Sequence, residues 1–151
     1  MTMLCKLTCV LTVMGGMLGG ASGAVAQPLF ALLNGYNECS PSVCGVGDLN
    51  GFGAAKILFF TATSICFGIT ISGLTGTPTA AHIQLGASGT NGFIFVILTP
   101  PTTGNPGASS GCVSNVSAAT ISSISSAPTS WYVNLKTINF PNGAIRGQLQ
   151  R

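Results

Sequence analysis

The chain alternates short apolar runs with clusters of Gly, Pro, Asn and Ser, and this pattern restricts its fold more than any other feature. Between residues 65 and 71, Ile or Phe occupies every second position, which is typical of a strand with one face on a core. Two further apolar runs, at 131–138 and 144–149, flank a Phe-Pro-Asn-Gly turn. That arrangement predicts a closing β-hairpin.

Other segments extend the same pattern. We expect strands at 29–33, 54–63, 65–72, 81–85 and 93–98. Because residues 93–98 are uniformly apolar, we expect that strand to be central in its sheet. Val116, Ile121 and Ile124 are spaced as in a short amphipathic helix, although the Ser-rich composition also suits a loop. The chain as a whole predicts an all-β, Ig-like or Greek-key β-sandwich of about seven to nine strands, with a short helix near 116–126 left open.

The N-terminal segment has the order of a secretory signal peptide. Lys6 precedes an apolar run at 7–18, and small residues at 24–26 precede Gln27. The apolar run is shorter than the ~20 residues of a spanning helix, so we expect cleavage after Ala26 and no membrane span thereafter. Residues 1–26 are then the signal peptide and residues 27–151 a single domain. The expected location is extracellular or periplasmic, with association at the cell surface as an option.

Four cysteines remain after that cleavage: Cys39, Cys44, Cys66 and Cys112. An even number in an exported protein favours two disulfides, for which three pairings exist in principle. Cys39 and Cys44 flank a Ser-Pro-Ser turn and can close locally, which leaves Cys66 for Cys112. Strand alternation places Cys66 on the outward face, so its disulfide should tie an edge or loop segment rather than cross the core.

Charge is scarce in the chain. Residues 27–151 hold four basic and two acidic side chains, a net charge of about +2. Nucleic acid is excluded as a partner because it requires a basic face to neutralise phosphates. A nearly uncharged surface offers little repulsion between molecules, which is compatible with self-association or with an extracellular protein partner.

Three segments resemble the chordin-type (CHRD) domain family. They are Phe-Ala-Leu-Leu-Asn-Gly-Tyr-Asn-Glu at 30–38, Ala-His-Ile-Gln-Leu-Gly-Ala-Ser-Gly-Thr-Asn-Gly at 81–92, and Trp-Tyr-Val-Asn-Leu-Lys-Thr with Phe-Pro-Asn-Gly-Ala-Ile-Arg-Gly-Gln-Leu at 131–149. The resemblance covers about residues 29–149 and implies a small secreted module without enzymatic activity. In chordin-like proteins such domains belong to extracellular proteins that bind growth factors.

The chain departs from this family at its histidines. The family pattern offers His at positions that here read His82, Gln84 and Lys136. If the strands pair as neighbours, alternation gathers these side chains on one polar sheet face. The predicted polar patch is Glu38, His82, Gln84, Asn134, Lys136 and Arg146. Within it we expect Arg146 to pair with Glu38, and His82 to bond Glu38 or a backbone carbonyl. If that face is open, an exposed Tyr132 beside Lys136 would form a contact patch on it.

Catalytic and metal chemistry have few residues to draw on. A transition-metal site needs three or four ligands, and with the cysteines in disulfides the chain offers His82, Glu38 and the distant Asp48. Asp48 lies in a Gly-rich turn whose simplest explanation is an Asx-turn. Serines are abundant, but the chain has only one histidine that could act as their base. We therefore predict no catalytic residue, no metal and no cofactor.

Three functions follow as hypotheses. The first is a non-enzymatic extracellular module that binds, or has a structural role, through its polar sheet face. The second is a subunit that assembles with itself in a cell envelope or extracellular matrix, which the low charge favours. The third is a metal-binding sandwich protein related to copper–zinc dismutases.

Overall fold

The computed structural model describes residues 27–41 and 43–151; the predicted signal peptide, residues 1–26, lies outside the described residues. The strands are β1 (Leu29–Asn34), β2 (Cys39–Ser40), β3 (Val43–Cys44), β4 (Phe52–Thr61), β5 (Ser64–Ser72), β6 (Pro78–Leu85), β7 (Ile94–Leu98), β8 (Gly107–Val113), β9 (Trp131–Thr137) and β10 (Ile145–Gln148). The helices are α1 (Ala118–Ser126) and the 3-10 turns η1 (Gly35–Asn37) and η2 (Pro128–Ser130). In this part of the chain no helix is long and apolar enough to cross a membrane.

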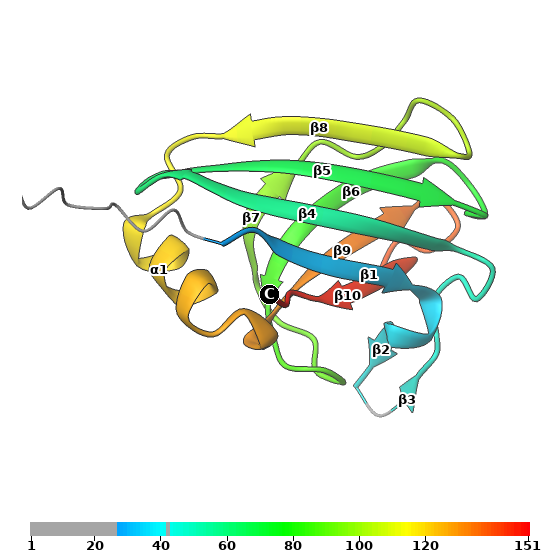
Figure 1. Cartoon of the computed structure of the whole chain (residues 1–151). Helices are drawn as coiled ribbons and strands as arrows, with labels where there is room; N and C mark the ends of the chain where they lie inside the picture. The colour runs from blue at the N-terminus through cyan, green and yellow to red at the C-terminus, as the bar shows by residue number, and fades with distance from the viewer. Residues whose placement is uncertain (1–26, 42) are drawn as a thin grey trace, which may run out of the picture.

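Eight of these strands form one antiparallel sheet in the order β7-β6-β9-β10-β1-β4-β5-β8. Figure 1 shows β8, β5, β4 and β1 as one layer in front of β7, β6, β9 and β10. The layers are joined where β10 pairs with β1, and Ser109 Oγ donates to the Thr99 carbonyl at 2.8 Å between the two sheet edges. The all-β class is confirmed, as a sandwich that approaches a closed barrel.

The core lies between the two layers and follows the predicted alternation. In β5, Ile65, Phe67, Ile69 and Ile71 are buried while the intervening residues are half-buried or exposed. Helix α1 closes one end of the core with Ile121 and Ile124. Its first turn is capped by the Ser117 side chain, which accepts from the Thr120 N–H at 3.1 Å. The segment near 116–126 is therefore a helix.

The closing hairpin is also confirmed. Strands β9 and β10 pair antiparallel, with Val133 opposite Gly147 and Leu135 opposite Ile145. After the turn, the Ala144 N–H still donates to the Leu135 carbonyl at 2.7 Å. This hairpin places two polar positions side by side near the middle of the sheet, Asn134 opposite Arg146.

The prediction that residues 93–98 form a central strand is wrong. β7 is an edge strand, paired only to β6 in the sheet. Val96 and Leu98 point into the core, but Ile97 is 70% exposed. An apolar run indicates that a strand favours burial. The position of that strand in the sheet depends instead on which strands pair with it.

Both expected disulfides are present. Cys39–Cys44 spans the β2–β3 hairpin, and Cys66–Cys112 joins two residues directly opposite each other on β5 and β8. β8 is the second edge of the main sheet. Cys66–Cys112 therefore fastens an edge strand from the outward side, as the alternation of β5 predicts.

Candidate functional site

Strands β6, β9 and β10 bring most of the predicted polar patch onto one face. Asn134 on β9 lies opposite His82 on β6 and opposite Arg146 on β10. Two residues further along, Tyr132 lies between Gln84 and Gln148 in the same way. Glu38 reaches this face from the segment that joins η1 to β2. Side chains from four distant parts of the chain thus share one layer, on the opposite side of the strands from the apolar core.

This polar layer is covered rather than open. Glu38, His82, Gln84, Asn134 and Arg146 are all buried, and Lys136 is half-buried. Tyr132, which would form a contact patch if the face were open, is buried: its hydroxyl accepts from the Gly92 N–H at 3.1 Å. The cover comes from the 86–92 loop and the disulfide hairpin β2–β3, which are tied together by Asn91 Nδ2 donating to the Cys39 carbonyl at 2.7 Å.

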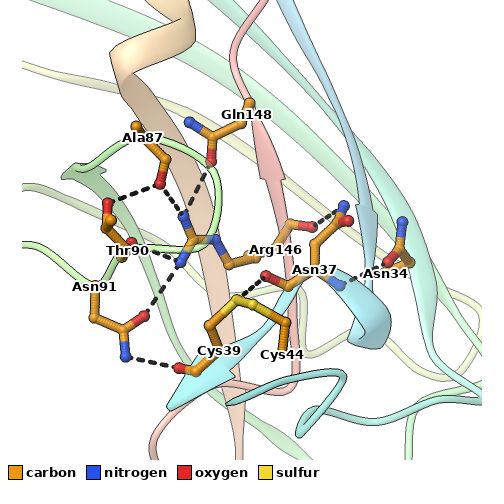
Figure 2. Close-up of a disulfide and its surroundings, with 9 residues drawn as sticks. All are labelled: Asn34, Asn37, Cys39, Cys44, Ala87, Thr90, Asn91, Arg146 and Gln148. Atoms are coloured by element: carbon orange, nitrogen blue, oxygen red, sulfur yellow. Dashed lines mark hydrogen bonds between the residues drawn. A yellow bond between two sulfur atoms is a disulfide. The ribbon is translucent and has the colours of Figure 1, made fainter. Parts of the chain in front are cut away.

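Arg146 holds this cover in place. Its guanidinium donates to the carbonyls of Ala87 and Thr90, and to the side-chain oxygens of Asn91 and Gln148, at 3.0–3.2 Å (Figure 2). The guanidinium carbon also lies 3.5 Å from the centre of the Tyr132 ring. Burial lowers the pKa of the Arg146 guanidinium, while Tyr132 and Glu38 oppose that change.

The expected Arg146–Glu38 pair is therefore wrong. The donors of Arg146 are directed to the 86–92 loop because that loop presents several carbonyl oxygens that match the planar fork of the guanidinium. Figure 2 shows the fork facing Ala87, Thr90 and Asn91, away from the Asn37 side of the strand.

Glu38 is an acid in a desolvated position. Its side-chain Oε1 accepts from Asn134 Nδ2 at 2.7 Å, and the residue is 3% exposed. Gly143 packs so closely on the carboxylate that any side chain there would collide with it. Desolvation raises the pKa of Glu38 from 4.5 to about 7, although Arg146 and then Lys136 act in the opposite direction. At neutral pH this carboxyl group exchanges between its charged and neutral forms.

His82 does not make the hydrogen bond that we expected. Its Nδ1 is buried without a hydrogen-bond partner, as is Oδ1 of the paired Asn134. Burial and then the charge of Lys136 lower the pKa of His82, which favours the neutral imidazole. Within residues 27–41 and 43–151, no three His, Cys, Asp or Glu side chains gather in a metal-binding group.

Asp48, the other acid, has a structural role. It is buried, and its carboxylate accepts from the backbone N–H groups of Asn50 and Thr75. The first contact closes the expected Asx-turn, and the second ties that turn to the segment after β5. Asp48 therefore lies apart from the polar patch.

A pocket of about 790 Å³ opens beside Glu38. Glu38, Gln84, Asn134 and Lys136 contribute its charged and amide groups, and Phe93, Ile94 and Phe140 contribute apolar surface. His82 and Arg146 are not among the residues that line it. The predicted polar patch is thus divided: four members face the pocket, one is an isolated buried imidazole, and one anchors the cover.

Sequence reasoning missed several residues of this site. Asn91 and Gln148 hold the cover, and Phe93 forms the exposed apolar rim of the pocket. Gly143 makes room for the Glu38 carboxylate. Asn91 lies in a Thr-Asn-Gly sequence and Gly143 in an Asn-Gly sequence, and both sequences predict turns. A predicted turn does not indicate which distant side chain the turn will contact.

Taken together, the curled sheet, the two disulfides and the pocket define a disulfide-bonded all-β module with a concave polar site. The family model for the CHRD domain matches residues 29–149, and the chain belongs to the CHRD domain family. The comparison with curated proteins found no match, and neither did the comparison with solved structures. The disulfides fit an oxidising compartment.

Proposed function

We propose that this protein is a secreted, non-enzymatic CHRD module that binds its ligand in the pocket beside Glu38. The observation that carries the proposal is the pocket itself. Its volume of about 790 Å³ falls within the range of small-molecule sites, and it joins a few convergent polar groups to an apolar wall. Such a combination supplies both affinity, from the wall, and orientation, from the polar groups.

A binding role fits these residues better than catalysis. Glu38 is the only acid that lines the pocket, and the other acid of the chain, Asp48, is engaged in its turn. The single histidine does not line the pocket, and the ionisable side chains that line it with Glu38 are Lys136 and Tyr132, whose hydroxyl accepts from the Gly92 N–H. We place the protein outside the cell or in the periplasm, where its disulfides persist.

The test is retention of ligand from the native extracellular medium on immobilised protein. Phe93→Ala removes an 83% exposed ring from the pocket rim, and Phe60→Ala removes a 74% exposed ring from β4, outside the pocket. We expect Phe93→Ala to lose the retained ligand and Phe60→Ala to keep it. Equal retention by both variants and the unchanged protein would contradict a pocket ligand.

A second candidate, a self-assembling subunit, is favoured by the outward face of β1 and β4. That face carries one charged side chain, Lys56, which lies over the Phe30 ring at 5.7 Å. The remaining exposed apolar side chains on it are Phe30, Leu32, Phe52, Leu58 and Phe60. An exposed apolar face of this kind is typical of an interaction surface.

Light scattering after size-exclusion chromatography tests this second function. If the face joins copies of the chain, the mass should exceed that of one chain, and Leu32→Lys with Phe60→Lys should restore the monomer. A matched change at the pocket, Phe93→Lys, should leave the assembly intact. A strict monomer at high concentration would eliminate this candidate.

A further inference from the structure

The pocket beside Glu38 offers hydrogen-bond donors and acceptors, the ammonium group of Lys136, and the Glu38 carboxyl group, which is only partly charged at neutral pH. The Glu38 carboxyl accepts, the Lys136 ammonium donates, and the amides of Gln84, Asn139 and Asn142 do both. An anionic ligand would meet the Glu38 carboxylate, and a cationic ligand would meet Lys136. The complementary ligand is therefore neutral and carries several hydroxyl groups, because each hydroxyl both donates and accepts.

The pocket is also lined by apolar and aromatic side chains. Phe93 is 83% exposed, Ile94 beside it is 47% exposed, and Phe140 is partly buried against the core. The backbone immediately before Phe93 is fixed, because the Gly92 N–H donates to the buried Tyr132 hydroxyl. The ring of Phe93 is thus an exposed apolar surface on a fixed backbone. Because the backbone is already ordered, a ligand that packs on this ring loses little conformational entropy of the protein.

We propose that this pocket binds a neutral saccharide. A sugar ring has an apolar C–H face and a rim of hydroxyls, so its face packs on Phe93 while its hydroxyls reach Glu38, Gln84 and Lys136. The inference rests on the proposed function, because it assigns a ligand class to the same pocket. It adds that the ligand is recognised by its hydroxyl groups rather than by its charge.

The experiment is calorimetric titration of the purified disulfide-bonded protein with oligosaccharides. The neutral probes are cellohexaose, mannohexaose and N-acetylchitohexaose; the charged probes are the deacetylated chitohexaose, which is cationic, and a heparin hexasaccharide, which is anionic. We expect at least one neutral probe to bind, and a charged probe of similar length to bind more weakly. The pair of acetylated and deacetylated chitohexaose tests the charge argument directly.

Matched variants locate the binding. We expect Phe93→Ala and Lys136→Met each to weaken the neutral probe about tenfold. Phe60→Ala and Lys56→Met remove the same side chains from β4 outside the pocket and should change the affinity by less than about twofold. Unfolding curves of the four variants confirm that each remains folded.

The outcomes separate the inference from the function on which it rests. If no neutral probe binds but ligand from the medium is retained in a Phe93-dependent way, the saccharide is wrong and the pocket function stands. If the ligand retained from the medium is a peptide, the saccharide inference is likewise wrong and the pocket function stands. If only the heparin probe binds and Lys56→Met weakens it as much as Lys136→Met, surface charge is responsible and the saccharide inference is overturned. If neither probe nor retained ligand responds to Phe93→Ala, both proposals fall.

Discussion

At the scale of single residues, the burial of the Glu38 carboxyl group is the property that sequence patterns predict least. A glutamate in a polar segment reads as a solvated charge, yet this one is 3% exposed and has its pKa raised to about 7. The cause is tertiary: Asn134 donates to the carboxyl group, and Gly143 and Gly47 pack closely on the Glu38 side chain. Burial of its charged form has a measurable effect on folding.

Glu38 should make the fold less stable as the pH rises. The folded protein holds this proton more tightly than the unfolded chain, so the stabilising effect is complete below pH 4.5 and is lost as the pH rises through about 7. The loss is about 3 kcal/mol. Glu38→Gln keeps an acceptor for Asn134 and should abolish this loss, as measured by urea unfolding between pH 4.5 and about pH 8.

The difference between the two proteins isolates Glu38. His82 has a lowered pKa and acts in the opposite direction, with stability rising as the pH rises, but it is present in both proteins. A free-energy difference between wild type and Glu38→Gln that does not change with pH would show that the carboxyl group is solvated.

Arg146 should tolerate no substitution, including lysine. Lysine keeps the charge but lacks the planar fork that reaches the Ala87 and Thr90 carbonyls together. We expect Arg146→Lys to reduce the free energy of unfolding by about 2–4 kcal/mol, measured by urea unfolding. The matched control is Arg151→Lys, because Arg151 is exposed and donates to the Ser125 carbonyl; its expected effect is below about 0.5 kcal/mol. Equal effects would mean that the fork is not needed.

At the scale of elements, local periodicity predicted most strands of the main sheet but not β8, whose first residues are rich in Gly and Ser, and it predicted the positions of strands less well. The alternation in β5 and the hairpin β9–β10 were predictable because each depends on residues that are neighbours in sequence. The edge position of β7 was not predictable, because it depends on how the other strands pair: β6 pairs with β9 on its other side, and no further strand pairs with β7 in the sheet. Helix α1 needed both its Ser117 cap and the core that receives Ile124.

The two disulfides should differ in their contribution to stability. Cys66–Cys112 closes a loop with a sequence separation of 46, and Cys39–Cys44 closes one of 5. In the chain-entropy account the first contributes about 4 kcal/mol and the second about 2 kcal/mol. Urea unfolding of Cys66→Ser/Cys112→Ser and of Cys39→Ser/Cys44→Ser should show that order. The reverse order would mean that the short hairpin contributes mainly by bracing the 86–92 loop through Asn91.

At the scale of the whole molecule, low charge and an apolar outward face leave the surface with few means of repelling a partner. The two candidate functions use different surfaces, the pocket beside Glu38 and the outward face of β1 and β4. Variants at Phe93 and Phe60 therefore distinguish them. The polar face of β6, β9 and β10 contributes part of the pocket lining and otherwise lies beneath loops.

Export should leave a chain that begins at Gln27. Small residues at 24–26 suit a signal peptidase, and the first strand starts only at Leu29, so cleavage there removes no residue of the sheet. Intact mass and N-terminal sequencing of the protein recovered from the medium should show residues 27–151 with both disulfides formed. Recovery of a chain that retains residues 1–26, associated with membranes, would contradict this maturation.

The sequence by itself determined the all-β class, the closing hairpin, the disulfide pairing and the family, because each is recorded in short spacings and local motifs. It also placed His82, Gln84, Asn134 and Arg146 on one face, since a strand repeats every two residues. Only the tertiary structure decided that this face is covered, that Arg146 binds the 86–92 loop, and that Glu38 is desolvated beside a pocket. Those properties arise from contacts between segments 52 to 96 residues apart in sequence, and local patterns carry no record of such contacts.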